Sequence, residues 1–127
     1  MTILMVEDSS TNRVYLKKIL EHAGHTVLAA ANGVEALKVL AANRVDCLLT
    51  DLTMPQLDGW GLIARIREKQ EWANLPIILI TGSAEIDDVK RARAVGLKHY
   101  VVKPIDADRV LAAVAQATAA PAEHAAP

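Results

Sequence analysis

Five short runs of branched aliphatic residues alternate with amphipathic segments along this 127-residue chain, and this alternation most constrains the fold. Short apolar runs of this kind are typical of buried strands. Between them, apolar residues return at three- and four-residue spacing, as at Leu16, Ile19 and Leu20, which predicts helices. The five predicted strands lie at residues 2–6, 26–30, 45–49, 77–81 and 99–102. The pattern therefore predicts an α/β protein.

Capping signals support the same order of elements. Asn32 with Glu35 three residues later is a capping-box pattern, and Asp58 stands where another helix would begin. Gly24 and Gly96 fall where helices should end. Strands that alternate with helices favour right-handed crossovers and a parallel sheet whose two faces are both covered. The sequence thus predicts an open five-stranded parallel sheet with helices on both faces.

The composition is that of one globular domain, which we place at residues 1–118, followed by a flexible Ala/Pro-rich tail at 119–127. Fourteen Lys and Arg against fifteen Asp and Glu leave a net charge of −1, which argues against direct binding to nucleic acid or a membrane surface. No stretch reaches the roughly 20 apolar residues that span a bilayer. The single cysteine, Cys47, lies in an apolar run, which indicates a reduced, cytoplasmic protein.

Charged and polar side chains stand at the ends of the predicted strands. Glu7 and Asp8 follow the first strand, Asp51 follows the third, Thr81 ends the fourth, and Lys103 follows the fifth. In open parallel sheets, ligands bind beyond the carboxyl ends of the strands. We therefore expect these five side chains to converge on one rim of the sheet.

Three acidic groups at one rim predict a bound cation. Two carboxylates about 4 Å apart repel by about 4 kcal/mol at an effective dielectric near 20. Mg²⁺ fits best, because it takes a few carboxylate oxygens and leaves positions for phosphate oxygens. With Mg²⁺ and Lys103 balancing the charge, Asp51 can act as a nucleophile towards phosphorus and form an aspartyl phosphate. Thr81 would then hydrogen-bond a phosphoryl oxygen.

The motifs "VED", "TDLTMPQLDG", "ILIT" and "HYVVKP" together resemble the receiver domains of two-component response regulators over about residues 2 to 117, with single-domain chemotaxis regulators as the nearest type. The resemblance implies a flavodoxin-like, doubly wound sheet of strand order 2-1-3-4-5. It also implies that Asp51 accepts a phosphoryl group from a phosphohistidine. Asp8, Asp51 and the backbone carbonyl of Thr53 would bind Mg²⁺, with Glu7 acting through a water.

The same resemblance implies a phosphorylation-dependent signalling switch rather than a metabolic enzyme. Lys103 would stabilise the phosphoryl charge, the Lys103–Pro104 bond would be cis, and Thr81 and Tyr100 would form the switch. The implied partners are a sensor histidine kinase or histidine phosphotransfer protein and a downstream protein target, with the chain a monomer or a phosphorylation-dependent dimer. Glu7 departs from the family, since Asp is common at that position.

Alternative functions share parts of this pattern. A flavodoxin-type cofactor binder has the same architecture, but "EDSST" places two acids where a flavin phosphate would bind. A haloacid dehalogenase-type phosphatase also uses a strand-end Asp with Mg²⁺, yet Thr53 stands where its second acid belongs. A degenerate receiver that only docks to partners would not need every charged position filled. A receiver excised from a hybrid histidine kinase or larger regulator remains open.

Overall fold

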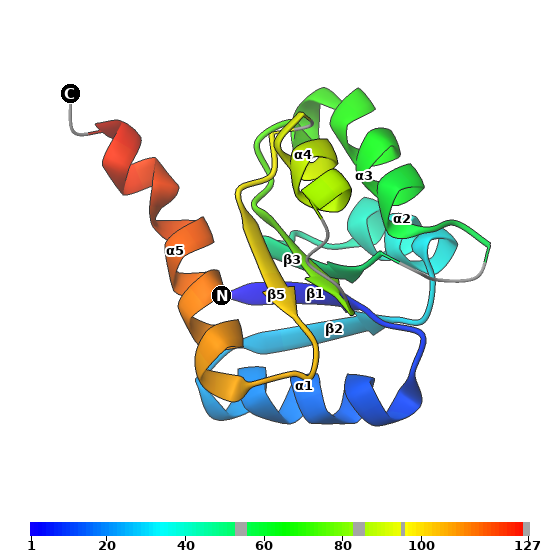
Figure 1. Cartoon of the computed structure of the whole chain (residues 1–127), viewed down its shortest axis with the longest axis vertical. Helices are drawn as coiled ribbons and strands as arrows, with labels where there is room; N and C mark the ends of the chain where they lie inside the picture. Colours follow the sequence, from blue (N-terminus) through cyan, green and yellow to red (C-terminus); the bar gives the residue numbers. More distant parts are fainter. Residues whose placement is uncertain (53–55, 83–85, 95, 126–127) are drawn as a thin grey trace.

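The computed structural model describes the backbone of residues 1–52, 56–82, 86–94 and 96–125, and their side chains apart from those of 86–89 and 120–125. Strands and helices alternate throughout these ranges (Figure 1). The elements are β1 (Thr2–Val6), α1 (Ser10–His22), β2 (Thr26–Ala30), α2 (Gly33–Ala42), β3 (Cys47–Asp51), α3 (Gly59–Glu68), the short 3₁₀ helix η1 (Gln70–Trp72), β4 (Ile77–Thr81), α4 (Ile86–Ala94), β5 (His99–Val102) and α5 (Ala107–Ala125).

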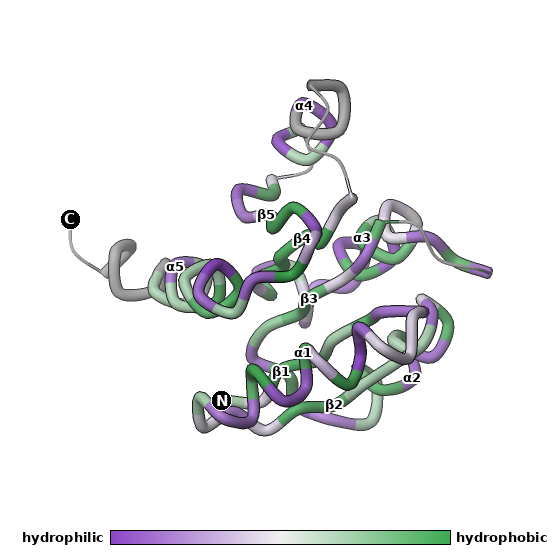
Figure 2. The backbone as a smooth tube through the Cα atoms, turned by 60° about the horizontal axis from the view of Figure 1, so that its bottom comes forward, coloured by the Kyte–Doolittle hydropathy of each residue, from purple (hydrophilic) through white to green (hydrophobic). Residues whose placement is uncertain are grey.

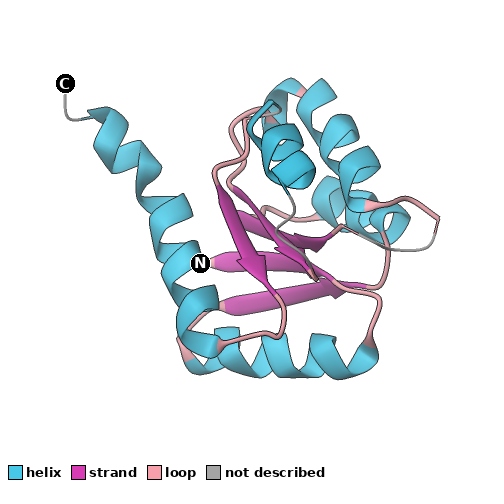
Figure 3. Ribbon diagram, in the orientation of Figure 1, coloured by secondary structure: helices cyan, strands magenta, loops and turns pink. Residues whose placement is uncertain are grey.

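The strands form one five-stranded sheet in the order β2-β1-β3-β4-β5, and every neighbouring pair is parallel. Figure 3 shows this sheet at the centre of the molecule, with helices on both sides. The predicted α/β class, the doubly wound topology and the 2-1-3-4-5 order are therefore confirmed. The carboxyl ends of β1 and β3 lie next to each other because these strands pair in the middle of the sheet.

Alternate residues of each strand pack against opposite layers of helices, as the two-residue period of a strand requires. On β1, Leu4 and Val6 belong to the apolar cluster formed with α2 and α3, whereas Ile3 and Met5 belong to the cluster formed with α1 and α5. All residues of β3 and β4 are buried. The central strands are accordingly mostly green, the hydrophobic end of the scale, in Figure 2.

One predicted strand lies two residues away from its observed position. The third run was placed at 45–49, but β3 runs from Cys47 to Asp51. Its register explains the shift: Cys47 pairs with Ile3 at one end, and Asp51 pairs with Ile80 at the other. Asp46 instead accepts a hydrogen bond from the Thr2 amide on its carboxylate, at 2.8 Å. Asp51 is thus the last residue of the strand and not the first residue after it.

The helix ends follow the capping signals. Asn32 caps α2 by accepting a hydrogen bond from the Glu35 amide at 2.9 Å, and Asp58 caps α3 through the Gly61 amide at 2.7 Å. Ser9, which the sequence analysis did not single out, caps α1. These caps fix where each helix begins relative to the strand before it.

The last helix continues into the segment predicted to be a tail. Its backbone is helical from Ala107 to Ala125, and its final turns project beyond the sheet in Figures 1 and 3. The domain boundary at residue 118 and the flexibility of 119–127 stay predictions. Within the described ranges, none of the helices combines the length and the apolarity that a bilayer crossing needs.

Candidate functional site

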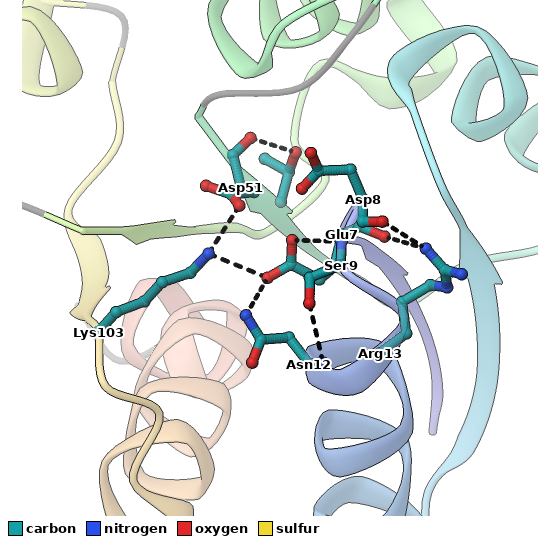
Figure 4. A network of polar contacts seen from close by, with 8 residues as sticks. Glu7, Asp8, Ser9, Asn12, Arg13, Asp51 and Lys103 are labelled. Atoms are coloured by element: carbon teal, nitrogen blue, oxygen red, sulfur yellow. Dashed lines mark hydrogen bonds and ion pairs between the residues drawn. The ribbon is translucent and has the colours of Figure 1, made fainter.

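Three carboxylates meet where β1 and β3 end. Glu7 and Asp8 directly follow β1, and Asp51 closes β3. One carboxylate oxygen from each of the three lies within 4.8 Å of those of the other two. Glu7 and Asp51 are buried, whereas Asp8 is exposed to solvent. The structure therefore brings these predicted residues together in one cluster, which is shown in Figure 4.

Lys103 reaches this acidic cluster from the end of β5. Its Nζ donates to Asp51 Oδ2 at 2.8 Å and lies 3.0 Å from Glu7 Oε1. Partial burial favours a lower pKa for Lys103, but the hydrogen bonds to Asp51 and Glu7 outweigh it, so its pKa is raised above the usual value. The bond from Lys103 to Pro104 is cis, the geometry that the resemblance implied. Lys103 thus stays charged between the two buried carboxylates.

Glu7 is the most enclosed member of the cluster, with no exposed surface. Its Oε1 accepts from the Asn12 side-chain amide at 3.1 Å, and its Oε2 accepts from the Ser9 amide at 3.3 Å. A buried carboxylate is tolerated only when donors surround it. Together with Lys103, these donors from the start of α1 supply that environment.

Arg13 holds the backbone of the same turn. Its Nη1 donates to the carbonyl oxygens of Glu7 at 2.8 Å and Asp8 at 3.0 Å (Figure 4). The sequence analysis missed Asn12 and Arg13 as site residues, because polar residues in a first helical turn are usually solvated. Only their position in the sequence could have pointed to them, because the first turn of α1 follows shortly after Glu7 and Asp8.

The start of α3 approaches the end of β3 so closely that position 59 requires a glycine. A Cβ atom at Gly59 would collide with the backbone carbonyl of Asp51, and the Gly59 amide donates to the Leu52 carbonyl at 2.9 Å. The amino end of α3 therefore packs directly against the end of β3. Thr53, whose carbonyl was predicted to bind metal, lies outside the described residues.

Thr81 and Tyr100, the predicted switch residues, lie on β4 and β5. Asp51 pairs in register with Ile80, so Thr81 stands one position further along the neighbouring strand. Thr81 is buried, and its carbonyl accepts a hydrogen bond from the Lys103 amide at 2.7 Å. Tyr100 is 43% exposed. The two residues therefore occupy a buried and an outward position, respectively.

The donor set of the acidic cluster fits Mg²⁺. Three carboxylates cluster here, and Lys103 lies within hydrogen-bonding distance of two of them, Glu7 and Asp51. All the available ligand atoms are hard oxygens, and Asp8 opens to solvent, which suits an ion that retains several waters. The geometry is compatible with a metal site formed by Glu7, Asp8 and Asp51.

Comparison with known proteins gives one consistent family. The model of the response regulator receiver domain matches residues 3–115. A chemotaxis protein CheY homolog of Campylobacter jejuni subsp. jejuni is 39% identical over 106 residues, which are 82% of this chain and 82% of that protein. Chemotaxis protein CheY of Pseudomonas aeruginosa is 37% identical over 84% of this chain and 87% of its own length. These relatives are of similar length to this chain.

Solved structures agree with this family. The structure of chemotaxis protein CheY4 of Vibrio cholerae superposes with a TM-score of 0.87 at 28% identity, over 91% of this chain and 97% of that one. Similar sequence also occurs inside longer proteins: the sensor histidine kinase CheAY of Helicobacter pylori is 35% identical over 80% of this chain but only 13% of its own length. The alternative of a receiver within a larger protein therefore stays open.

Proposed function

This chain belongs to the family of response regulator receiver domains of two-component signalling, and we propose that Asp51 accepts a phosphoryl group from a phosphohistidine in a Mg²⁺-dependent reaction. The observation that most supports this is the setting of Asp51. Its carboxylate lies 2.8 Å from the Lys103 ammonium and is clustered with those of Glu7 and Asp8 at the carboxyl end of β3. Under this proposal the nucleophile, a cation and the metal ligands share one site.

The chemistry is a transfer between two covalent partners. An Asp51 carboxylate oxygen forms the new bond to phosphorus while the bond from phosphorus to the imidazole nitrogen breaks, and the imidazole leaves with the electron pair. Bound Mg²⁺ would neutralise charge on the transferred group. Asp8, Asp51 and the Thr53 carbonyl would hold this ion, with Glu7 acting through a water. Lys103 would move from Asp51 Oδ2 to a phosphoryl oxygen.

The consequence of phosphorylation would pass through Thr81 and Tyr100. A phosphoryl group adds about −1.5 to −2 charges and three strong acceptor oxygens, which the Thr81 hydroxyl would approach. Tyr100 would then turn inward from its exposed position into the space that Thr81 leaves. This change of shape on the side of α4, β5 and α5 would be read by another protein.

The proposed partners follow from this scheme. A sensor histidine kinase or histidine phosphotransfer protein would supply the phosphoryl group, and a downstream protein would bind the switched surface. The chain would act in the cytoplasm as a monomer or phosphorylation-dependent dimer, without direct contact to nucleic acid or membrane. It would catalyse only its own phosphorylation and dephosphorylation.

Incubation with Mg²⁺ and acetyl phosphate tests the assignment of Asp51. The wild-type protein should gain the mass of one phosphoryl group, and Asp51→Asn should gain none. Asp58→Asn is the matched control, because Asn replaces Asp as a helix cap at little cost and this residue caps α3 only seven positions away. Equal phosphoryl uptake by Asp51→Asn and wild type would refute the proposal.

A further inference from the structure

We propose that Asn12 is a positioning residue for this site: its side-chain amide holds the Glu7 carboxylate in place, and this contact strengthens the binding of Mg²⁺. The inference rests on the proposed function, since it concerns the same metal site. Its basis is the hydrogen bond of 3.1 Å from Asn12 Nδ2 to Glu7 Oε1, seen at the lower side of the cluster in Figure 4.

Glu7 needs such a partner because of its length. A glutamate has one more rotatable bond than an aspartate, so its carboxylate has more positions to choose from. Here that carboxylate is fully buried and lies among two other acids. Hydrogen-bond donors with fixed positions are needed to hold the Glu7 carboxylate in one orientation. A metal site binds best when neighbouring groups keep its ligands in the required geometry.

The start of α1 supplies those donors as a closed network. The backbone N–H of Asn12 donates to Ser9 Oγ at 3.3 Å, and this hydrogen bond caps the helix. The Ser9 backbone amide donates to Glu7 Oε2 at 3.3 Å, and the Asn12 side chain completes the ring at Oε1. The orientation of Glu7 is therefore tied to the first turn of a helix that packs on the sheet through Leu16 and Leu20.

The chemical type of Asn12 suits this task. Its amide donates a hydrogen bond without adding a positive charge that would compete with Mg²⁺. Lys103 shares the same Oε1 atom of Glu7 at 3.0 Å, but in the proposed reaction Lys103 turns towards the phosphoryl group. Asn12 would then remain as the side-chain donor that keeps Glu7 in place.

The variant Asn12→Ala separates positioning from folding. The hydrogen bond that caps α1 comes from the backbone amide of residue 12, so alanine retains it. Alanine also has a higher helix propensity than asparagine. Because Lys103 and the Ser9 amide still donate to the buried Glu7 carboxylate, we expect the variant to fold with only a small loss of melting temperature, whereas a purely structural role for Asn12 requires that its Mg²⁺ affinity stay that of wild type.

Isothermal titration calorimetry of the unphosphorylated proteins with Mg²⁺ tests the inference. Loss of a group that orients a metal ligand typically weakens metal affinity by about 10- to 100-fold, and because Glu7 would act through a water we expect a smaller rise in Kd, about 3- to 10-fold, for Asn12→Ala. Thr11→Ala, a neighbouring exposed residue on the same turn, is the control and should bind Mg²⁺ as wild type does.

A second pair of proteins tests whether the loss of Mg²⁺ affinity in Asn12→Ala depends on Glu7. In a Glu7→Asp background the side chain is shorter by one methylene and we expect its carboxylate to lose the contact with the Asn12 amide, so adding Asn12→Ala should leave the Mg²⁺ affinity unchanged. An equal loss in both backgrounds, or no loss in the wild-type background, would overturn the inference. So would a wild-type protein that binds no Mg²⁺.

This experiment stands apart from the test of the proposed function, because it uses no phosphodonor. If the wild-type protein binds Mg²⁺ but takes up no phosphoryl group, the proposed function fails while the role of Asn12 is still decided by the affinities. If phosphorylation occurs, Asn12→Ala should approach the wild-type rate at saturating Mg²⁺. A rate that stays low there would mean that Asn12 acts on the chemical step and not on Mg²⁺ binding, which contradicts the inference.

Discussion

β3 and β5 both contribute residues to the site, but their surroundings differ. β3 lies between β1 and β4, and all five of its residues are buried. β5 lies at the edge of the sheet, and of its four residues only Val101 is buried. Asp51 thus belongs to a strand packed on both faces, whereas Lys103 and Tyr100 belong to an edge. The proposed switch would use this division, since Asp51 would stay in place while Lys103 and Tyr100 move.

The largest expected effect lies in the core of β3. Leu49 is completely buried, so Leu49→Ala should lower the free energy of unfolding by about 2 to 5 kcal/mol, through lost burial and the cavity left behind. Urea unfolding followed by circular dichroism measures this change. A loss below 1 kcal/mol, on the order of a surface substitution, would contradict the claim that β3 is packed on both faces.

The next effect concerns Lys103, which joins the edge strand to the buried acids. Lys103→Met leaves the buried carboxylates of Glu7 and Asp51 without their common donor, and we expect a loss of about 1 to 3 kcal/mol in the free energy of unfolding. Added Mg²⁺ should recover part of it, because the ion offsets the same charges. Urea unfolding with and without Mg²⁺ measures both effects. Lys98→Met, at an exposed lysine just before β5, is the control and should change little.

The buried thiol of Cys47 allows a test of whether water is excluded from β3, by measuring stability as a function of pH. Burial raises the pKa of Cys47 to about 12, so the folded protein keeps the thiol neutral while the unfolded chain ionises it from about pH 8.5. A pKa raised by folding gives stability that is lost as pH rises. Relative to Cys47→Ala, wild type should lose roughly 1 to 2 kcal/mol between pH 8 and pH 10 in urea unfolding. A pH-independent difference between the two proteins would mean that water reaches the thiol.

The smallest expected effect is at Tyr100 on the edge strand. Its side chain is 43% exposed, so Tyr100→Ala should change the free energy of unfolding by no more than about 0.5 kcal/mol. Any loss in binding of the phosphorylated protein to its downstream target would then reflect switching and not folding. A destabilisation comparable to that of Leu49→Ala would remove the distinction between the two strands.

The convergence of the acidic cluster was predictable from sequence for a simple reason. The carboxyl ends of parallel strands meet at one edge of the sheet, so acids that follow apolar runs must approach one another. Glu7, Asp8, Asp51 and Lys103 were found by this argument alone, and the cluster bears it out. The family resemblance then added the roles that remain proposals. The position of Thr53 lies outside the described residues.

Asn12 and Arg13 were not predictable in the same way. Both hydrogen-bond to Glu7, one through its carboxylate and the other through its carbonyl. Such contacts depend on side-chain rotamers and on the angle at which α1 leaves β1, and no spacing rule encodes either. A polar first turn has the same sequence pattern whether it faces solvent or a buried carboxylate.

The amino-acid sequence by itself determined the order of strands and helices and the end of the sheet at which the acids gather, because apolar periodicity and capping are local properties of the chain. Only the tertiary structure decided that β3 ends at Asp51, that Lys103 bridges two buried carboxylates, and that the first turn of α1 encloses Glu7. Strand register and hydrogen-bond partners are set by segments that lie far apart in the chain and meet only when the sheet has formed.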